Sequence, residues 1–262
     1  MPSAILWLLD GSLVPEADVA FFARQLGASE AQRYTRFQRQ ERKRQFLLGR
    51  ILLRFAVSNL MSLPPSALDV IERPDKAPQL LLSDSQNLRL GFSLSHSRQW
   101  VACVVGSNVS LGMDIEVNDP ARDIFGISQA VFHPNEHRWL LSQLDSACMS
   151  AFYQLWSTRE ALHKLMSTLG HETVLSSLVG VNGSIATQGP KWHRYTLPHS
   201  ALMLAVCSDR PLSSLRKIEL PRMARIDWLT AERVATWPQA GFKTEPTRPS
   251  VVFDLRRSLI EE

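Results

Sequence analysis

The sequence has little cysteine and no paired cysteine motif. Only three of its 262 residues are cysteine, namely Cys103, Cys148 and Cys207, and no two of them form a C-x-x-C pair. A sparse, odd set excludes a disulfide framework, argues against a structural zinc site and is typical of a reducing compartment. We therefore expect a cytoplasmic protein.

Long apolar runs are also absent. No stretch approaches the ~18 uninterrupted apolar residues that a membrane-spanning helix needs. The first nine residues are apolar but have no basic leader, and Asp10 and Gly11 follow at once. This pattern predicts a first β-strand and not a signal peptide, so we expect no association with a membrane.

Internal repeats and low-complexity tracts are absent too, and the remaining composition is that of a globular protein. Hydrophobic residues make up 45% and charged residues 21%, so the chain can bury a sizeable core in one large domain or two small ones. The net charge of +4 and the pI near 9.2 favour an anionic partner. Nucleic acid, a phosphorylated cofactor or an acidic protein would each satisfy this charge.

The positive charge is concentrated in one segment that also has helical spacing of its apolar residues. Eight basic residues face a single acid, Glu41, between positions 33 and 54. Ser29 and Gln32 have the form of a capping box, and Leu63-Pro64-Pro65 is a stop signal. The segment predicts one helix from about Ser29 to about Met61. Its basic residues are Arg33, Arg36, Arg39, Arg42, Lys43, Arg44, Arg50 and Arg54.

The rest of the chain predicts alternating strands and helices. Residues 100–105 and 111–117 have the pattern of buried strands around a Gly-Ser-Asn turn, which predicts a β-hairpin over 98–117. Helices are predicted over 135–145 and 150–169, the second ending at Gly170 as its C-cap. Beyond about Arg210 the pattern weakens, so we expect a peripheral extension.

Two acidic residues carry the first chemical signal. Asp114 and Glu116 lie two residues apart on the predicted strand, so their side chains share one face while Met113 and Ile115 take the other. Two carboxylates placed in this way repel each other unless a cation lies between them, and oxygen ligands suit magnesium. The alternative is a half-solvated strand with acidic outer positions.

Two further segments carry polar residues in suggestive positions. Glu160 and Lys164 are four residues apart and lie on one helix face, either at a site or as a plain surface ion pair. The segment Gly91–Ser97 ends in serines around His96 and offers hydrogen-bond donors to an anion. Its alternative is a histidine satisfied within a turn.

Three other functions fit parts of the sequence. His133-Pro134-Asn135-Glu136-His137 matches the H-x-x-E-H pattern of inverted zinc proteases, but a helix that starts at Pro134 leaves His133 outside it as a cap. The arginine-rich helix with its aromatic residues matches a nucleic-acid-binding module without catalysis. An Asp-x-Glu pair with a distant glutamate also fits a metal-dependent nuclease.

Taken together, the motifs resemble the 4′-phosphopantetheinyl transferases of the Sfp type. That family carries a Ser-His-Ser segment, then Gly-x-Asp-x-Glu, then Trp-x-x-Lys-Glu-(Ala/Ser)-x-x-Lys. Here they occur in this order as Ser95-His96-Ser97, as Gly112–Glu116 and as Trp156–Lys164. The resemblance includes Phe46–Arg50 and Phe132-x-x-x-Glu136 and covers roughly residues 30 to 208.

The resemblance implies an activity and a set of roles. The family transfers the phosphopantetheine arm of coenzyme A to a serine of an apo carrier protein, with magnesium as cofactor. Asp114, Glu116 and Glu160 resemble the metal ligands, Glu160 also acts on the serine proton, and Lys164 acts on the departing 3′,5′-ADP. The residues implied in coenzyme A binding are Arg33, Arg44, Arg50, Lys76, Ser95 and His96.

Two positions depart from the family pattern. The Gly-Lys-Pro segment of the family reads Asp75-Lys76-Ala77-Pro78 here, where the acid partly offsets the charge of Lys76. Arg159 replaces a lysine, which keeps the charge but not the geometry.

The resemblance also implies an architecture and a partner. We expect an α+β fold of two pseudo-symmetric halves, 1–109 and 110–210, each a small antiparallel sheet packed by a helix, with an extension at 211–262. The halves would meet near residues 108–112, with coenzyme A in the cleft between them. We expect a monomer that binds an acidic helix of its carrier protein, and no nucleic acid.

Overall fold

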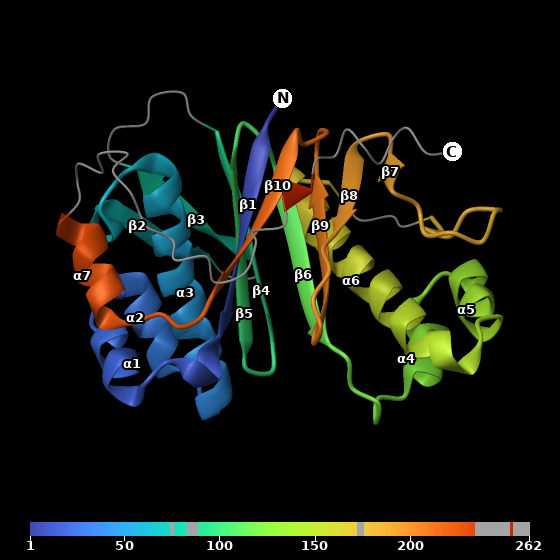
Figure 1. Ribbon diagram of the computed structural model, residues 1–262, viewed down its shortest axis with the longest axis horizontal. Helices are drawn as coiled ribbons and strands as arrows, with labels where there is room; N and C mark the ends of the chain where they lie inside the picture. Colours follow the sequence, from blue (N-terminus) through green and yellow to red (C-terminus); the bar gives the residue numbers. More distant parts are fainter. Residues whose placement is uncertain (74–75, 83–88, 172–175, 234–251, 254–262) are drawn as a thin grey trace. The chain divides into compact units, whose positions relative to one another are not determined.

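The computed structural model describes residues 1–73, 76–82, 89–171, 176–233 and 252–253. These residues form two compact units, each with its own hydrophobic core. The first unit consists of Met1–Val109 with the described residues from Leu212 onward, and the second consists of Ser110–Pro211. Both contain helices and sheets (Figure 1), which confirms the α+β class.

In the first unit, a sheet in the order β11-β10-β1-β5-β4 is covered by the long helix α3 (Figure 1). The interior of β5 is buried, and apolar residues of α3 such as Leu48 and Ile51 pack in the same core. Removal of this apolar surface from water drives the packing. The elements are β1 (Ser3–Asp10), α1 (Glu16–Ala23), α2 (Ala28–Thr35), α3 (Gln40–Met61), β2 (Leu68–Arg73), β3 (Lys76–Leu82), β4 (Leu90–Ser97), β5 (Trp100–Ser107), β10 (Ser214–Leu220), α7 (Arg225–Arg233) and β11 (Val252–Phe253), with short 3-10 helices at Gly11–Leu13 and Pro65–Ala67.

The chain beyond Arg210 differs from the peripheral extension that we expected. Strand β10 pairs in parallel with β1, with Ser3 opposite Ser214, and so lies within the sheet of the first unit. This parallel pair also makes the sheet mixed, where we expected a purely antiparallel one. Residues 234–251 and 254–262 of the expected extension lie outside the described residues.

The predicted helix over 29–61 is two helices. Helix α2 ends at Thr35 and α3 begins at Gln40. The rings of Phe37 and Phe46 lie 5.1 Å apart, whereas nine residues of continuous helix would span about 13 Å. Their packing therefore requires the break. The capping box is also shifted, because the Glu30 carboxylate accepts from the Gly27 N–H at 2.8 Å.

The predicted hairpin over 98–117 is wrong, although both of its strands exist. Strand β5 pairs with β4 on one edge and with β1 on the other, so both of its edges are occupied. The next strand, β6 (Leu111–Val117), belongs to the second unit and pairs with β9. Asn108, with a φ of 57°, ends the run of β5.

The second unit is an antiparallel sheet in the order β6-β9-β8-β7, and the long helix α6 packs on β6 and β9 (Figure 1). Helix α6 ends at Leu169, and its C-cap Gly170 has a φ of 74°, the left-handed conformation that glycine favours. The predicted C-cap is therefore confirmed, although the helix begins at Asp145 and not at Ser150. The remaining elements are α4 (Ile124–Val131), α5 (Pro134–Leu141), α6 (Asp145–Leu169), β7 (Gln188–Gly189), β8 (Trp192–Thr196) and β9 (Leu202–Ser208).

None of the helices of the described ranges combines the length and the hydropathy that crossing a bilayer requires.

Candidate active site

Strand β6 presents two carboxylates from the second unit. Met113 and Ile115 are buried, and Asp114 and Glu116 alternate with them along the strand. Asp114 is itself only 6% exposed, so its carboxylate is almost entirely removed from solvent. Glu116 is partly exposed, nearer the end of the strand.

Helix α6 turns a row of polar residues toward the same strand. The Trp156 Nε1–H donates to Glu116 Oε1 at 3.1 Å, and the Lys164 ammonium lies 2.8 Å from Asp114 Oδ1. Lys164 also donates to the Met113 carbonyl oxygen at 2.9 Å. Residues four apart lie one above the other on a helix, so Glu160 lies between these two contacts, on the helix face toward β6.

Gly112 allows this close approach of helix and strand. A β-carbon at position 112 would lie 2.0 Å from the Ala161 carbonyl oxygen and 2.5 Å from the Leu165 nitrogen, both on the backbone of α6. Contacts shorter than 3 Å to a fixed backbone are incompatible with any side chain. The first residue of Gly-x-Asp-x-Glu is therefore glycine for a steric reason.

The carboxylates Asp114, Glu116 and Glu160 are oxygen donors of the kind that magnesium prefers. In the described part of the chain, however, no group of three or more His, Cys, Asp or Glu side chains is gathered closely enough to hold a metal ion. One oxygen of Asp114 forms an ion pair with the Lys164 ammonium. The donor chemistry thus fits magnesium, while the present side-chain positions do not form a closed set of ligands.

Arg159, which replaces a lysine of the family pattern, has a partner inside the unit. Its guanidinium donates to both oxygens of the buried Glu136 carboxylate, at 2.6 and 2.7 Å. The same carboxylate accepts from the backbone N–H groups of His133 and Leu178. Arg159 and Glu136 therefore tie α6, the start of α5 and the segment at Leu178 together.

The H-x-x-E-H segment has a structural role. His133 is the N-cap of α5, its Nδ1 accepting from the Asn135 N–H, and the helix begins at Pro134, one residue before the predicted start at 135. His137 Nδ1 lies 2.8 Å from the Ser128 hydroxyl. His133 thus caps a helix and His137 contacts a serine hydroxyl, so the two rings are not directed at one metal position, which argues against a zinc site.

In the first unit, Arg33 and Arg50 meet at one carboxylate. Both lie 2.5 Å from Glu72 of β2, one at each oxygen. Burial alone would raise the pKa of Glu72, but the hydrogen bonds and charges of Arg50 and Arg33 outweigh it and hold the pKa below its ordinary value. Arg50 is buried, whereas Arg33 remains 46% exposed.

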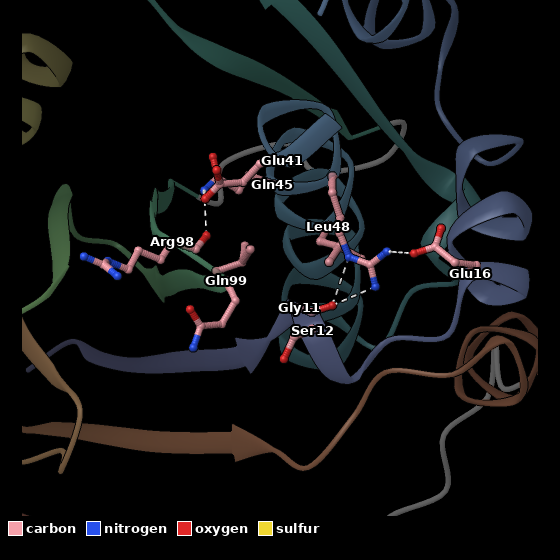
Figure 2. Close-up of a pocket in the computed structure, with 10 residues that line it drawn as sticks. Gly11, Ser12, Glu16, Glu41, Gln45, Leu48, Arg98 and Gln99 are labelled. Atoms are coloured by element: carbon pink, nitrogen blue, oxygen red, sulfur yellow. Dashed lines mark hydrogen bonds and ion pairs between the residues drawn. The ribbon is translucent and has the colours of Figure 1, made fainter. Parts of the chain in front are cut away.

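Arg44 lines a pocket of about 780 Å³ in the first unit (Figure 2). Its guanidinium donates to the carbonyl oxygens of Gly11 and Val14 and pairs with Glu16. These contacts are all made to the chain itself. The other lining residues are Ser12, Glu41, Gln45, Leu48, Arg98, Gln99 and Val101.

The Ser-His-Ser segment occupies the end of β4. Ser95 is buried and His96 is partly exposed. Arg42 of α3 places its Nη1 at 3.3 Å from each ring nitrogen of His96, so a cation lies beside the imidazole. Lys76 is the first residue of β3, where it pairs with Arg73.

Comparison with known proteins matches both units to one family. Residues 15–108 match the family described as 4′-phosphopantetheinyl transferase, N-terminal, and residues 110–184 match the 4′-phosphopantetheinyl transferase superfamily. The chain belongs to the 4′-phosphopantetheinyl transferase superfamily, as its motifs predicted.

Individual relatives are similar over part of their length. The transferase HetI of Nostoc sp. strain PCC 7120 is 27% identical over 57% of this chain and 63% of its own. The transferase ffp of Bacillus subtilis is 27% identical over 71% and 83%, and psf-1 of Bacillus pumilus is 31% identical over 47% and 49%. For HetI and the transferases gsp and slr0495, the matched region spans 57% to 65% of the relative.

Proposed function

We propose that this protein transfers the 4′-phosphopantetheine arm of coenzyme A to a serine of an apo carrier protein and releases 3′,5′-ADP. The observation that carries the proposal is the alignment of α6 with β6. Trp156 contacts Glu116 and Lys164 contacts Asp114. Glu160 lies on the same helix, one turn after Trp156 and one turn before Lys164. The order of these residues is that of the family motifs.

Asp114, Glu116 and Glu160 would hold magnesium, which would neutralise the charge that develops on the departing 3′,5′-ADP as the phosphoanhydride bond of coenzyme A breaks and the phosphopantetheinyl group moves to the serine oxygen. Lys164 donates one hydrogen bond to the Asp114 carboxylate and one to the Met113 carbonyl oxygen, which hold its ammonium beside Asp114. From this position its ammonium would stabilise or protonate the departing 3′,5′-ADP. Glu160 would accept the proton of the attacking serine hydroxyl, directly or through a water molecule.

The first unit would bind the remainder of coenzyme A. His96 with Ser95 would contact its phosphates, and the Arg42 guanidinium beside His96 adds a positive charge there. Arg33 is the most accessible of the proposed 3′-phosphate ligands, because its side chain is 46% exposed, compared with 24% for Arg44 and 9% for Arg50. Lys76 remains part of the proposal through its motif position alone.

The carrier protein would be recognised through charge. Arg36, Arg39 and Arg42 are exposed on the basic segment, and such a surface suits the acidic helix of a carrier protein. The same segment suggested a nucleic-acid-binding module. Arg50 and Arg54 are buried in ion pairs with acidic side chains, however, which removes part of the charge such a module would need.

We also propose a monomer that works in the cytoplasm.

The transfer assay uses fluorescent coenzyme A, magnesium and a panel of apo carrier proteins from fatty-acid, polyketide and peptide synthases. We expect label on a carrier serine and loss of labelling when EDTA is added. A nuclease or a nucleic-acid-binding module would leave every carrier unlabelled. Absence of label on the whole panel, with the protein folded, would refute the proposed function.

A further inference from the structure

Arg122 lies in the loop between β6 and α4, and its guanidinium lies over an aromatic cluster of α6. Its guanidinium carbon is 4.9 Å from the ring centroid of Trp156, 5.7 Å from that of Tyr153 and 5.8 Å from that of Phe152. A guanidinium over several ring faces is attracted by all of them and loses much of its freedom to move.

The same guanidinium reaches the carboxylate of the candidate site. Arg122 Nη1 lies 3.8 Å from Glu116 Oε1, the oxygen that also accepts the hydrogen bond of Trp156. The Trp156 indole N–H and the Arg122 guanidinium thus both lie close to the same oxygen of Glu116. Both side chains of the ion pair are mostly buried, with 28% and 21% exposure, so solvent screens this contact less than a surface pair.

The loop that carries Arg122 is itself anchored. The Asp119 N–H donates to the Tyr153 hydroxyl at 2.9 Å, and the Arg122 N–H donates to the Asp119 carbonyl oxygen at 3.2 Å. Tyr153 therefore binds the loop through its hydroxyl and the guanidinium through its ring. The position of Arg122 is set by the fold of the second unit.

We propose that Arg122 is a positioning residue that fixes the orientation of the Glu116 carboxylate together with Trp156. The inference rests on the proposed function, in which Glu116 holds the metal. Groups that orient such a ligand govern how well the site works without touching the substrate. Arginine suits this task because its delocalised cation lies over the rings while its Nη1 lies 3.8 Å from the carboxylate. Lysine would keep the charge but lose the stacking geometry.

The direct test observes Trp156 by NMR in the metal-free protein. The Nε1–H resonance of Trp156, assigned with Trp156→Phe, reports its hydrogen bond to Glu116. We expect Arg122→Ala to move this resonance and speed its exchange with water, and Arg122→Lys to give an intermediate effect. Arg225→Ala, which removes a guanidinium stacked on Phe21 in the first unit, is the matched control and should leave the signal unchanged.

The second readout is the kinetics of carrier labelling. Arg122→Ala should lower kcat about tenfold and leave KM for coenzyme A within about twofold, the effect expected of a group that orients a metal ligand. Arg122→Lys should recover part of kcat. If Arg122→Ala does not fold, Arg122→Met keeps apolar contact with the rings without the charge, and should show the same losses.

The outcomes separate this inference from the proposed function. If Arg122→Ala left the Trp156 resonance unchanged, or left kcat unchanged, the positioning role would be overturned. Carrier labelling by the wild type would still support the proposed function in that case. Conversely, a shifted resonance in a protein that labels no carrier would support the contact and refute the transferase. In that case the NMR result alone decides the role of Arg122.

Discussion

Gly112 on β6 and Ala161 on α6 pack backbone against backbone. A β-carbon on residue 112 would lie 2.0 Å from the Ala161 carbonyl oxygen. Because the neighbouring atoms belong to the backbone of a buried helix, they cannot yield as a flexible side chain would. This contact sets how closely α6 approaches β6, and with it the position of Glu160 and Lys164 relative to Asp114.

Gly112→Ala is therefore expected to displace α6 and to lose both stability and activity. Overpacking of this kind lowers the free energy of unfolding by about 1–3 kcal/mol. Urea denaturation measures the first effect and carrier labelling the second. The control is Gly49→Ala on α3, where the added carbon would meet only Val101 at 3.8 Å. That variant should gain up to about 1 kcal/mol from better helix propensity. A neutral Gly112→Ala would contradict the steric argument.

Glu160→Gln tests the carboxylate of α6 with almost no change in shape. We expect carrier labelling to fall at least about 100-fold, since the amide can neither accept the serine proton nor hold a divalent cation well. The melting temperature should stay near that of the wild type. Asp145→Asn removes an exposed carboxylate from the first turn of the same helix and should keep full activity. Near-normal labelling by Glu160→Gln would exclude the assigned role.

The sequence predicted what depends on local pattern. The alternation of Met113 and Ile115 with two acids required a strand, and Gly170 marked the end of α6. The pairing of strands depends on partners far away in the chain, and here the local pattern was misleading. β10 has the mixed polarity of a partly exposed strand, and its partner β1 lies about 210 residues earlier in the chain. Nothing near Ser214 indicates that partner.

In the candidate site, too, the sequence predicted what depends on motif spacing and missed contacts with residues far away in the chain. The motif spacing placed Asp114 and Glu160 on elements that do pack together. Partners that lack a spacing signal were missed: Glu72 is an ordinary acid in a strand, yet two arginines converge on it. Arg122 was missed for a similar reason, because its position in a loop does not indicate that its guanidinium lies over the aromatic rings of α6.

Glu72→Gln should destabilise the first unit. The substitution leaves the buried Arg50 guanidinium without its closest acid, although Glu30 remains at 3.8 Å. Breaking a buried ion pair from one side costs about 3 kcal/mol of unfolding free energy, measured in urea. The matched control is Glu16→Gln, which breaks the pair of an 85% exposed acid with Arg44 and should cost less than about 1 kcal/mol. Equal losses in the two variants would contradict the role of burial.

The cysteines provide a test of the two cores. All three are buried, and burial raises the pKa of Cys207 to about 12. The thiolate is the reactive form, so the fold suppresses access at all three cysteines and also suppresses ionisation at Cys103 and Cys207. We expect an aromatic disulfide reagent at neutral pH to modify the native protein slowly and to titrate three thiols after denaturation. Rapid reaction of any thiol in the native state would show that its core opens.

The Glu72 carboxylate also predicts how stability depends on pH. Burial opposes its ionisation, but Arg50 and Arg33 prevail and the folded-state pKa lies below the ordinary 4.5. The unfolded chain therefore binds the proton more tightly, and acid favours unfolding. The stabilisation is complete above the ordinary pKa and is lost as the pH falls through the folded-state pKa. We expect the unfolding free energies of wild type and Glu72→Gln to differ by a constant amount well above the ordinary pKa of 4.5 and to converge as the pH falls below it. Urea titrations across this range measure the difference, and a gap that persisted in acid would show that the charge of Glu72 is not what stabilises the unit.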